Sequence, residues 1–216
     1  MTNPSENIRK KRRDLSPYLF HFTNYEALCS ILNEECIKSK RGFQCFTEAP
    51  LTSMLKLLDY MASFSKPIFD QYAIGFSRDD LFSKYNARPV ILGSEQELKD
   101  IPSTYDWRKQ ELNVYTNDFE WLREWRIKGD FDFSLMAHEN IIIVAKSEDD
   151  LDCIRYNYKL LDVFLDDDQN FIDADIEITR AYRGISMETL LKERIKNDYQ
   201  LKDLLDQQEI GETIEF

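Results

Sequence analysis

Short strand-like segments alternate with amphipathic helical patterns along most of this chain, and the helical segments vary in length. The sequence predicts strands at 18–23, 37–40, 43–46, 72–76, 89–92, 121–128, 141–145 and 160–165. It predicts helices at 25–33, 50–64, 79–85, 95–100, 149–156 and 187–208. Residues 101–118 fit either a loop or a helix. Because the interleaving is irregular, it favours an α+β fold over a regular β-α-β array.

The length and composition indicate one globular domain. A chain of 216 residues with 43% apolar residues can bury one sizeable core. Six Gly and six Pro are too few to suggest a long irregular linker. We therefore expect a flexible basic arm at 1–17, an α+β domain at 18–183 and a helical C-terminal appendage at 184–216.

The charge distribution constrains the partners. A formal net charge of −12 disfavours stable, non-specific binding to phosphate backbones or anionic membranes. A basic run at 9–13 could contact nucleic acid or an acidic partner, although such a run is more often a solvated terminus. The first 17 residues carry no apolar segment, and no stretch is long and apolar enough to span a bilayer, so we expect a cytoplasmic protein without a membrane partner.

The sequence gives little support for a metal-binding site. The four cysteines form no C-x-x-C pair and only two histidines accompany them, so we expect buried, reduced thiols and no metal. Four residues near the end of the chain have the spacing of calcium ligands: Asp166, Asp168, Asn170 and Glu177. The glycine that such a loop requires is Phe171, so an acidic hairpin turn is the preferred interpretation.

His21 and Thr23 form the first candidate site. Both lie in the predicted strand Tyr18-Leu19-Phe20-His21-Phe22-Thr23, on the same face, because side chains alternate along a strand. An imidazole and a hydroxyl at a strand end suit a ribose or an amide. The alternative is a histidine at the edge of the core that is hydrogen-bonded to the backbone.

Glu124 is the second candidate. It lies in Leu122-Arg123-Glu124-Trp125-Arg126-Ile127, and alternation puts Arg126 on its face. A partly desolvated carboxylate could stabilise an oxocarbenium-like transition state. The alternative is a structural ion pair between Glu124 and an arginine on the same face.

The ordered series of segments resembles a known family. The segments are His-Phe-Thr at 21–23, Asn-Tyr-Glu-Ala-Leu-Cys-Ser-Ile-Leu at 24–32, Cys-Phe-Thr-Glu-Ala-Pro-Leu at 45–51, Tyr-Ala-Ile-Gly-Phe-Ser at 72–77, Ala-Arg-Pro-Val-Ile at 87–91 and Glu-Trp-Arg at 124–126. This series resembles the abortive phage-resistance (AbiGi-like) proteins and, more distantly, the DNA-modifying ADP-ribosyltransferase toxins. The resemblance covers about residues 18–130.

The resemblance implies an ADP-ribosyltransferase-like split sheet, mixed or antiparallel, with a cleft for NAD. His21 and Thr23 would hold the nicotinamide riboside, with His21 also contributing to catalysis, and Glu124 would be the catalytic glutamate. The remaining expected NAD contacts are an aromatic residue against the nicotinamide (Phe46, Tyr72 or Phe76) and the arginines Arg41, Arg88 and Arg126. The toxins carry an arginine where this chain has Glu48-Ala49-Pro50, so Arg41 and Arg88 are the nearest substitutes.

Two functions follow from this resemblance. The first is an enzyme of a phage-defence or toxin–antitoxin system that transfers ADP-ribose from NAD to nucleic acid or protein. The second is a non-catalytic interaction module on the same fold: an antitoxin, an inhibitor or a sensor subunit that binds a cognate defence-system protein. The missing arginine and the net charge favour the module, but the enzyme remains the preferred of the two predictions. A metal-dependent nuclease is a distant third, and Rossmann, P-loop and zincin motifs are absent.

Overall fold

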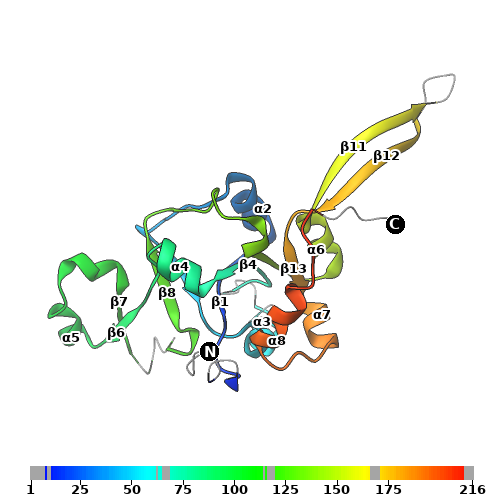
Figure 1. The fold of residues 1–216 in the computed structure, drawn as a ribbon. Coiled ribbons are helices and arrows are strands. Elements are labelled where there is room, and N and C mark those ends of the chain that lie inside the picture. The colour runs from blue at the N-terminus through cyan, green and yellow to red at the C-terminus, as the bar shows by residue number, and fades with distance from the viewer. Residues whose placement is uncertain are drawn as a thin grey trace, which may run out of the picture.

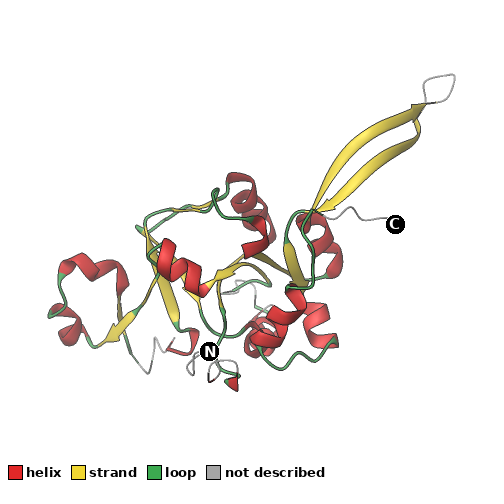
Figure 2. Ribbon diagram, in the orientation of Figure 1, coloured by secondary structure: helices red, strands yellow, loops and turns green. Residues whose placement is uncertain are grey.

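A seven-stranded mixed sheet forms the centre of the protein (Figures 1 and 2). A computed structural model describes residues 8, 11–61, 63–64, 69–113, 115, 120–165 and 171–211. The strand order is β13-β10-β4-β1-β3-β8-β5. These strands span Tyr18–Thr23 (β1), Phe43–Thr47 (β3), Tyr72–Ser77 (β4), Arg88–Pro89 (β5), Glu124–Lys128 (β8), Ile141–Ala145 (β10) and Arg183–Ser186 (β13). Within this sheet, as described, β10 and β13 pair in parallel and the other neighbours are antiparallel, so the α+β class and the mixed sheet are confirmed.

Helices cover both faces of this sheet. The helices span Tyr25–Glu34 (α2), Leu51–Met61 (α3), Arg78–Lys84 (α4), Glu95–Lys99 (α5), Glu148–Arg155 (α6), Met187–Lys192 (α7) and Asp198–Leu205 (α8), with short 3-10 helices at Ser103–Arg108 (η1), Glu120–Leu122 (η2) and His138–Asn140 (η3). Of these, α5 packs beside the sheet rather than on it. Leu28 of α2, Leu81 of α4 and Leu151 of α6 pack into the core cluster on one face. Residues of α3, α7 and α8 pack into the cluster on the other. We call these the α2 face and the α3 face.

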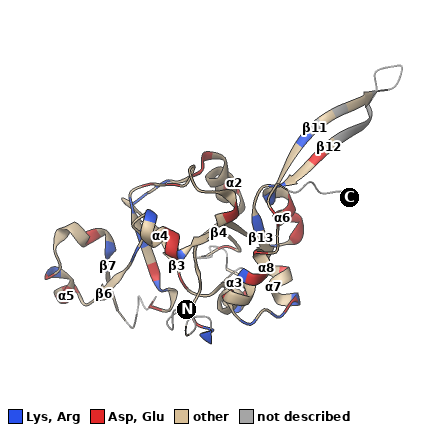
Figure 3. Cartoon of the chain, in the orientation of Figure 1, with Lys and Arg blue, Asp and Glu red and all other residues tan. Residues whose placement is uncertain are grey.

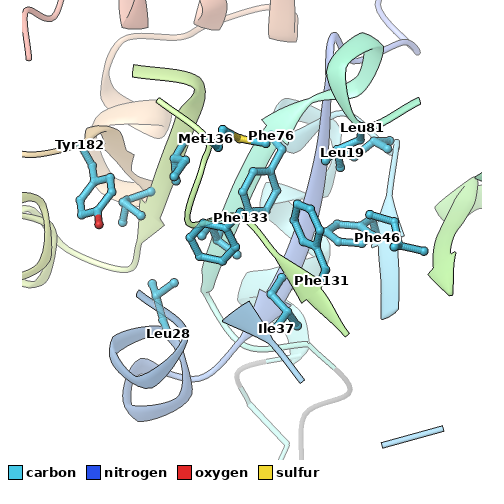
Figure 4. Close-up of a cluster of buried hydrophobic side chains, with 14 of the residues drawn as sticks. Leu19, Leu28, Ile37, Phe46, Phe76, Leu81, Phe131, Phe133, Met136 and Tyr182 are labelled. Atoms are coloured by element: carbon cyan, nitrogen blue, oxygen red, sulfur yellow. The ribbon is translucent and has the colours of Figure 1, made fainter. Parts of the chain in front are cut away.

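The core of the α2 face is rich in phenylalanine. Phe46, Phe76 and Phe131 meet edge to face, with ring centroids 5.1 to 6.2 Å apart (Figure 4). Such geometry adds to the stabilisation that the buried apolar area provides. Leu28 and Ile37 also line this cluster, so α2 and the following strand are held against the sheet.

Gly75 of β4 lies at a close approach to the Phe20 side chain of β1. It lies opposite Phe20 in the β1–β4 ladder, and a Cβ at this position would meet Phe20 Cε1 at 2.6 Å. The Phe20 ring therefore packs directly against the glycine on the α3 face, in the register that carries His21 and Thr23 on the opposite face.

Asp198 caps a helix far away in sequence. The residue before α3 is Pro50, whose side chain has no oxygen to accept the free N–H groups of the first turn. The fully buried Asp198 carboxylate accepts from Leu51 N at 2.9 Å and from Thr52 N and Oγ1 at 3.1 and 3.0 Å. The first turn of α8 is thus hydrogen-bonded to the start of α3.

The predicted long helix at 187–208 is wrong. Arg194 has a left-handed φ of 51°, which ends the first segment, and the Asn197 side chain then caps α8 by accepting from Tyr199 N and Gln200 N. The resulting bend lets both α7 and α8 pack on the α3 face, through Leu190, Leu201 and Leu205.

Several strand boundaries also differ from the sequence prediction. The expected strand at 121–128 begins at Glu124, because Arg123 has a left-handed φ of 48° and η2 precedes it. The expected strand at 89–92 is split into β5 and Ile91–Gly93 (β6), which pairs in parallel with Lys109–Glu111 (β7). The expected strand at 37–40 is only Cys36–Ile37 (β2), paired with Phe131–Asp132 (β9).

A long hairpin extends away from the body (Figure 1). Its strands are Tyr156–Leu165 (β11) and Phe171–Arg180 (β12), so β11 includes the strand predicted at 160–165. The acidic turn predicted around Asp166, Asp168 and Asn170 lies outside the described residues, as do residues 1–7, 9 and 10 of the basic arm. Within the described part of that arm, Ser16 is buried and Asp14 forms an ion pair with Arg123 at 2.8 Å.

Candidate functional site

A cavity of about 450 Å³ lies between α2 and β3 and contains the first candidate residues. His21 and Thr23 line it from β1, and Ala27, Ser30 and Ile31 line it from α2. Its volume is within the range of small-molecule sites. We call this cavity the α2 pocket.

His21 is held in a defined tautomer. Its Nδ1 lies 2.8 Å from the Cys45 carbonyl oxygen, and because that oxygen accepts, Nδ1 carries the proton. Burial lowers the pKa of His21, while the bond to Cys45 partly opposes this shift. The neutral ring therefore leaves Nε2 as an acceptor. The predicted alternative, a histidine bonded to the backbone, is confirmed at Nδ1.

Gln44 presents a buried amide without a partner. Its side chain is 5% exposed and lines the α2 pocket, and Nε2 has no hydrogen-bond partner among the described residues. A buried amide donor left unpaired costs about 1–3 kcal/mol. Such a group in a native protein suggests an additional ligand or water that pairs with it.

Three cations line the mouth of the α2 pocket. Lys38, Lys40 and Arg41 come from the loop between β2 and β3, and all three are exposed. Lys38 forms an ion pair with Glu34 of α2, which leaves the pocket with an excess of positive charge in a protein of net charge −12. Elsewhere basic and acidic residues are interleaved over the body (Figure 3).

Glu124 does not lie in this pocket. In the β3–β8 ladder, Thr47 lies opposite Glu124 and Cys45 lies opposite Arg126. In the β1–β3 ladder, Thr47 lies opposite Phe20. Since paired residues share a face and neighbours alternate, Glu124 lies on the α3 face, whereas His21 and Thr23 lie on the α2 face. Glu124 instead lines a separate cavity of about 290 Å³ with Pro89, Gln110 and Trp125 among its neighbours.

The Glu124 carboxylate is held in an ion pair. Arg126 Nε donates to Glu124 Oε1 at 2.6 Å, and their side chains are only 7% and 18% exposed. Arg126 also donates to the carbonyls of Trp107 and Lys109 at 3.1 and 3.0 Å and to Gln110 Oε1. The predicted alternative, a structural Glu–Arg pair on one face, is confirmed.

Cys45 of β3 contacts both candidate residues, His21 and Glu124. Its carbonyl accepts from His21, and its thiol is hydrogen-bonded to Glu124. Desolvation of the thiol and this bond raise the pKa of Cys45 to about 12, so the thiol is protonated at neutral pH. The sequence predicted buried cysteines, but Cys45 and Cys153 are exposed and Cys29 and Cys36 are half-buried.

Of the remaining predicted contacts, Arg41 lines the α2 pocket together with His21, and the Phe46 ring lies with its centroid 5.8 Å from that of the His21 ring. Arg88 donates to the carbonyls of Phe82 and Ala87 and stacks on the Phe82 ring. Phe46 and Phe76 are buried in the core of the α2 face, where their rings contact other phenylalanines. Tyr72 donates to Asp150 at 2.9 Å. The predicted nicotinamide-stacking role therefore has no exposed ring at Phe46 or Phe76.

Sequence reasoning missed Gln44, Lys38 and Lys40. A signal for Gln44 was present, because it alternates with Phe46 in Phe43–Thr47 and so occupies an inward position where an apolar residue is expected. A signal for the lysines was weaker, since a basic loop next to a strand is common on surfaces.

A larger cavity of about 870 Å³ is lined by residues of α4, η3 and α8, and by none of the predicted site residues. Its charges are largely paired: Arg78 with Glu48 and Asp79, and Arg183 with Asp206. In the described part of the chain, no cluster of His, Cys, Asp and Glu could hold a metal ion. No described helix combines the length and the apolar character that a bilayer crossing requires.

In comparisons with known proteins, no family model, no curated protein and no solved structure matches this chain.

Proposed function

We propose that this protein is a nucleotide-binding interaction module of a bacterial phage-defence system, built on an ADP-ribosyltransferase-like fold, with NAD as the ligand of the α2 pocket. In this proposal it senses NAD or a related nucleotide and transmits the bound state to a cognate defence protein. It is the non-catalytic alternative of the two functions that the family resemblance implies.

The unpartnered Gln44 amide beside a neutral His21 carries this proposal. Gln44 Nε2 can donate to a carboxamide or phosphate oxygen, and His21 Nε2 can accept from a ribose hydroxyl or a carboxamide N–H. Thr23 adds a hydroxyl that can do both. Arg41, Lys38 and Lys40 at the mouth suit a pyrophosphate. NAD carries a matching partner for each of these side chains: a carboxamide, ribose hydroxyls and a pyrophosphate.

The position of Glu124 favours binding over transfer. A catalytic carboxylate must reach the reacting sugar carbon, and Glu124 lies on the α3 face in an ion pair with Arg126. The groups that would bind the ligand and the group that would stabilise a sugar cation are therefore in different cavities. Binding without turnover is the function that this geometry supports.

Isothermal titration of the full chain with NAD tests the proposal. We expect binding that weakens as the salt concentration rises, because the mouth of the pocket is cationic. Arg41→Ala should weaken it, whereas Lys192→Ala, which removes an exposed cation on α7, should leave it unchanged. Absence of NAD binding at millimolar concentration, or equal losses in both variants, would refute the nucleotide ligand.

One observation keeps ADP-ribosyl transfer as a second candidate. His21 and Glu124 both bond to Cys45, through its carbonyl and its thiol, and β1 pairs with β3 at a single residue pair, Phe20 with Thr47. If β1 and β3 separated, a ligand in the gap between them could reach both His21 and Glu124, as in a split NAD cleft.

The enzyme candidate is tested with labelled NAD and mixed acceptors, single-stranded DNA, RNA and cell protein. Transfer of label by the wild type and its loss in Glu124→Gln, with NAD affinity unchanged, would establish the enzyme and replace the sensor. No transfer by either protein under conditions where NAD binds supports the module.

A further inference from the structure

The cavity of about 870 Å³ lies at one end of the central strands. Tyr18 at the start of β1, Ser77 at the end of β4 and Arg183 at the start of β13 line it together. They meet there because β4 runs antiparallel to β1 and β10, and β13 runs parallel to β10. The other walls are η3, α4 and α8, of which α4 and α8 are labelled in Figure 1. We call this the strand-end cavity, and it shares no lining residue with the α2 pocket.

Tyr18 presents a phenol hydroxyl to the strand-end cavity. Its ring packs edge to face on Phe20 in the core of the α3 face, with 7% of the residue exposed. Burial and then the charge of Asp206 raise the pKa of Tyr18, while Arg183 opposes the shift, so the hydroxyl faces these two cavity residues and is protonated at neutral pH. Within the described residues this hydroxyl has no hydrogen-bond partner. A buried hydroxyl without a protein partner indicates a ligand or water that pairs with it.

The cations on the cavity wall are already neutralised. The pairs are Arg78 with Glu48 and Asp79, Arg183 with Asp206, and Lys202 with Asp206. These are the only lysine and arginine residues that line the cavity in the described part of the chain. An anionic ligand such as a nucleotide would therefore find no unpaired cation here, in contrast to the mouth of the α2 pocket.

The carboxylates on the wall exceed the cations. Five acidic residues line the cavity: Asp79, Asp80, Glu139, Asp203 and Asp206. Asp80 is paired with Lys84, outside the cavity. Glu139 of η3 and Asp203 of α8 are both exposed, and neither forms an ion pair with a residue that the structure describes. Two unpaired carboxylates and a hydroxyl that can accept favour a cationic ligand.

The spread of these groups excludes a single metal ion in favour of an extended cation. A metal ion needs several ligands within about 2.6 Å of one point. Among the described residues, no group of His, Cys, Asp and Glu could hold a metal ion, and Glu139 and Asp203 lie on different walls. A ligand with charges spaced along a methylene chain can reach both carboxylates, while its methylenes lie on the apolar surfaces of Pro17 and Ile142.

We propose that the strand-end cavity binds a linear polyamine. Its ammonium groups donate to the carboxylates of Glu139 and Asp203 and to the hydroxyl oxygen of Tyr18. The net charge of −12 raises the local concentration of such a polycation around the protein. This second ligand site is separate from the α2 pocket and does not depend on nucleotide binding.

Titration calorimetry of the full chain with spermine at physiological salt tests the proposal. We expect saturable binding of one spermine, and binding at least about tenfold weaker in the Glu139→Gln/Asp203→Asn variant, which loses two charge-assisted hydrogen bonds. Tyr18→Phe keeps the ring and should bind about fivefold more weakly. The matched control is Asp59→Asn/Glu111→Gln, which removes two exposed carboxylates elsewhere, gives the same net charge and should bind like the wild type.

Two further measurements separate the ligand site from the fold and from the α2 pocket. Urea unfolding of the Glu139→Gln/Asp203→Asn variant should match the wild type, because both side chains are exposed, so this variant carries the test even where Tyr18→Phe lowers stability. Its affinity for NAD should also be unchanged, since neither residue lines the α2 pocket. Hydrogen exchange with spermine should show protection within 198–206.

Three results would overturn the polyamine site. Equal losses in the Glu139→Gln/Asp203→Asn variant and its control would show a general attraction of a polycation to an acidic protein. Displacement of spermine by an equal concentration of magnesium would show a simple counter-ion. A tetralysine peptide that binds more tightly than spermine, and loses affinity in the same variant, would assign the cavity to a basic segment of a protein partner.

Discussion

Replacing Gln44 by leucine should stabilise the protein and weaken its binding of NAD. The buried Nε2 atom has no partner among the described residues, so removing it relieves the cost of an unpaired donor. Leucine has a similar size and suits a position flanked by the Phe46 core. We expect the free energy of unfolding to rise by about 1–2 kcal/mol, which for a chain of this length raises Tm by roughly 2–8 °C.

The same Gln44→Leu substitution should weaken the binding of NAD. If Gln44 Nε2 donates to NAD, losing one neutral hydrogen bond costs about 1 kcal/mol, or roughly fivefold in Kd. A residue whose removal improves stability and harms binding is typical of a functional site. Stability is measured by urea unfolding monitored by tryptophan fluorescence, and affinity by titration calorimetry.

Gln208 provides the control for this prediction. Its Nε2 donates to the Gly184 carbonyl at 2.9 Å, and its Oε1 accepts from Gly184 N at 2.9 Å. Gln208→Leu removes two satisfied bonds and should lower stability by about 1–2 kcal/mol without affecting NAD affinity. If Gln44→Leu is as destabilising as Gln208→Leu, the Gln44 amide has a partner and the reasoning fails.

Two further predictions concern the fold. Asp198→Ala should lower the free energy of unfolding by about 3 kcal/mol, because it leaves the N–H groups of Leu51 and Thr52 without their buried acceptor. Asp203→Ala, on the exposed side of the same helix, should change it by under about 0.5 kcal/mol. Urea unfolding measures both values, and equal values would refute the cap. Because burial lowers the pKa of His21, folding favours its neutral form, so this stabilisation is present above the unfolded pKa of about 6.5 and is lost as the pH falls through the folded pKa. His21→Asn should therefore flatten the fall in stability between pH 7 and pH 5, and an unchanged slope would count against a buried neutral His21.

Much of the fold was predictable from local patterns. The strands at β1, β4 and β10 and the helices α2 and α4 follow apolar periodicity and side-chain caps, such as Asn24 before α2 and Ser77 before α4. A glycine within a strand pattern such as Gly75 indicates either a close approach or a bulge, and the structure shows the close approach. The failures are at Arg123 and Arg194, where a non-glycine residue adopts a left-handed conformation that tertiary packing imposes.

The candidate site was predictable only one strand at a time. Alternation correctly paired His21 with Thr23 and Glu124 with Arg126, because both pairs lie within single strands. Whether the two pairs share a face depends on the register of β1 with β3 and of β3 with β8. A shift of one residue exchanges the faces, and no local pattern fixes that register.

This separation of faces leads to a quantitative test of the proposed function. Effects of substitutions at sites that share no partner add, whereas residues acting on one ligand in one cleft are coupled by about 0.5–3 kcal/mol. Gln44 and Glu124 lie on opposite faces of β3 and β8, in different cavities. We therefore expect the Gln44→Leu/Glu124→Gln double variant to show the NAD affinity of Gln44→Leu alone, with a coupling energy under about 0.5 kcal/mol. A coupling above about 1 kcal/mol would mean that both side chains contact the same nucleotide, so that the sheet opens on binding and transfer rather than sensing becomes the better account.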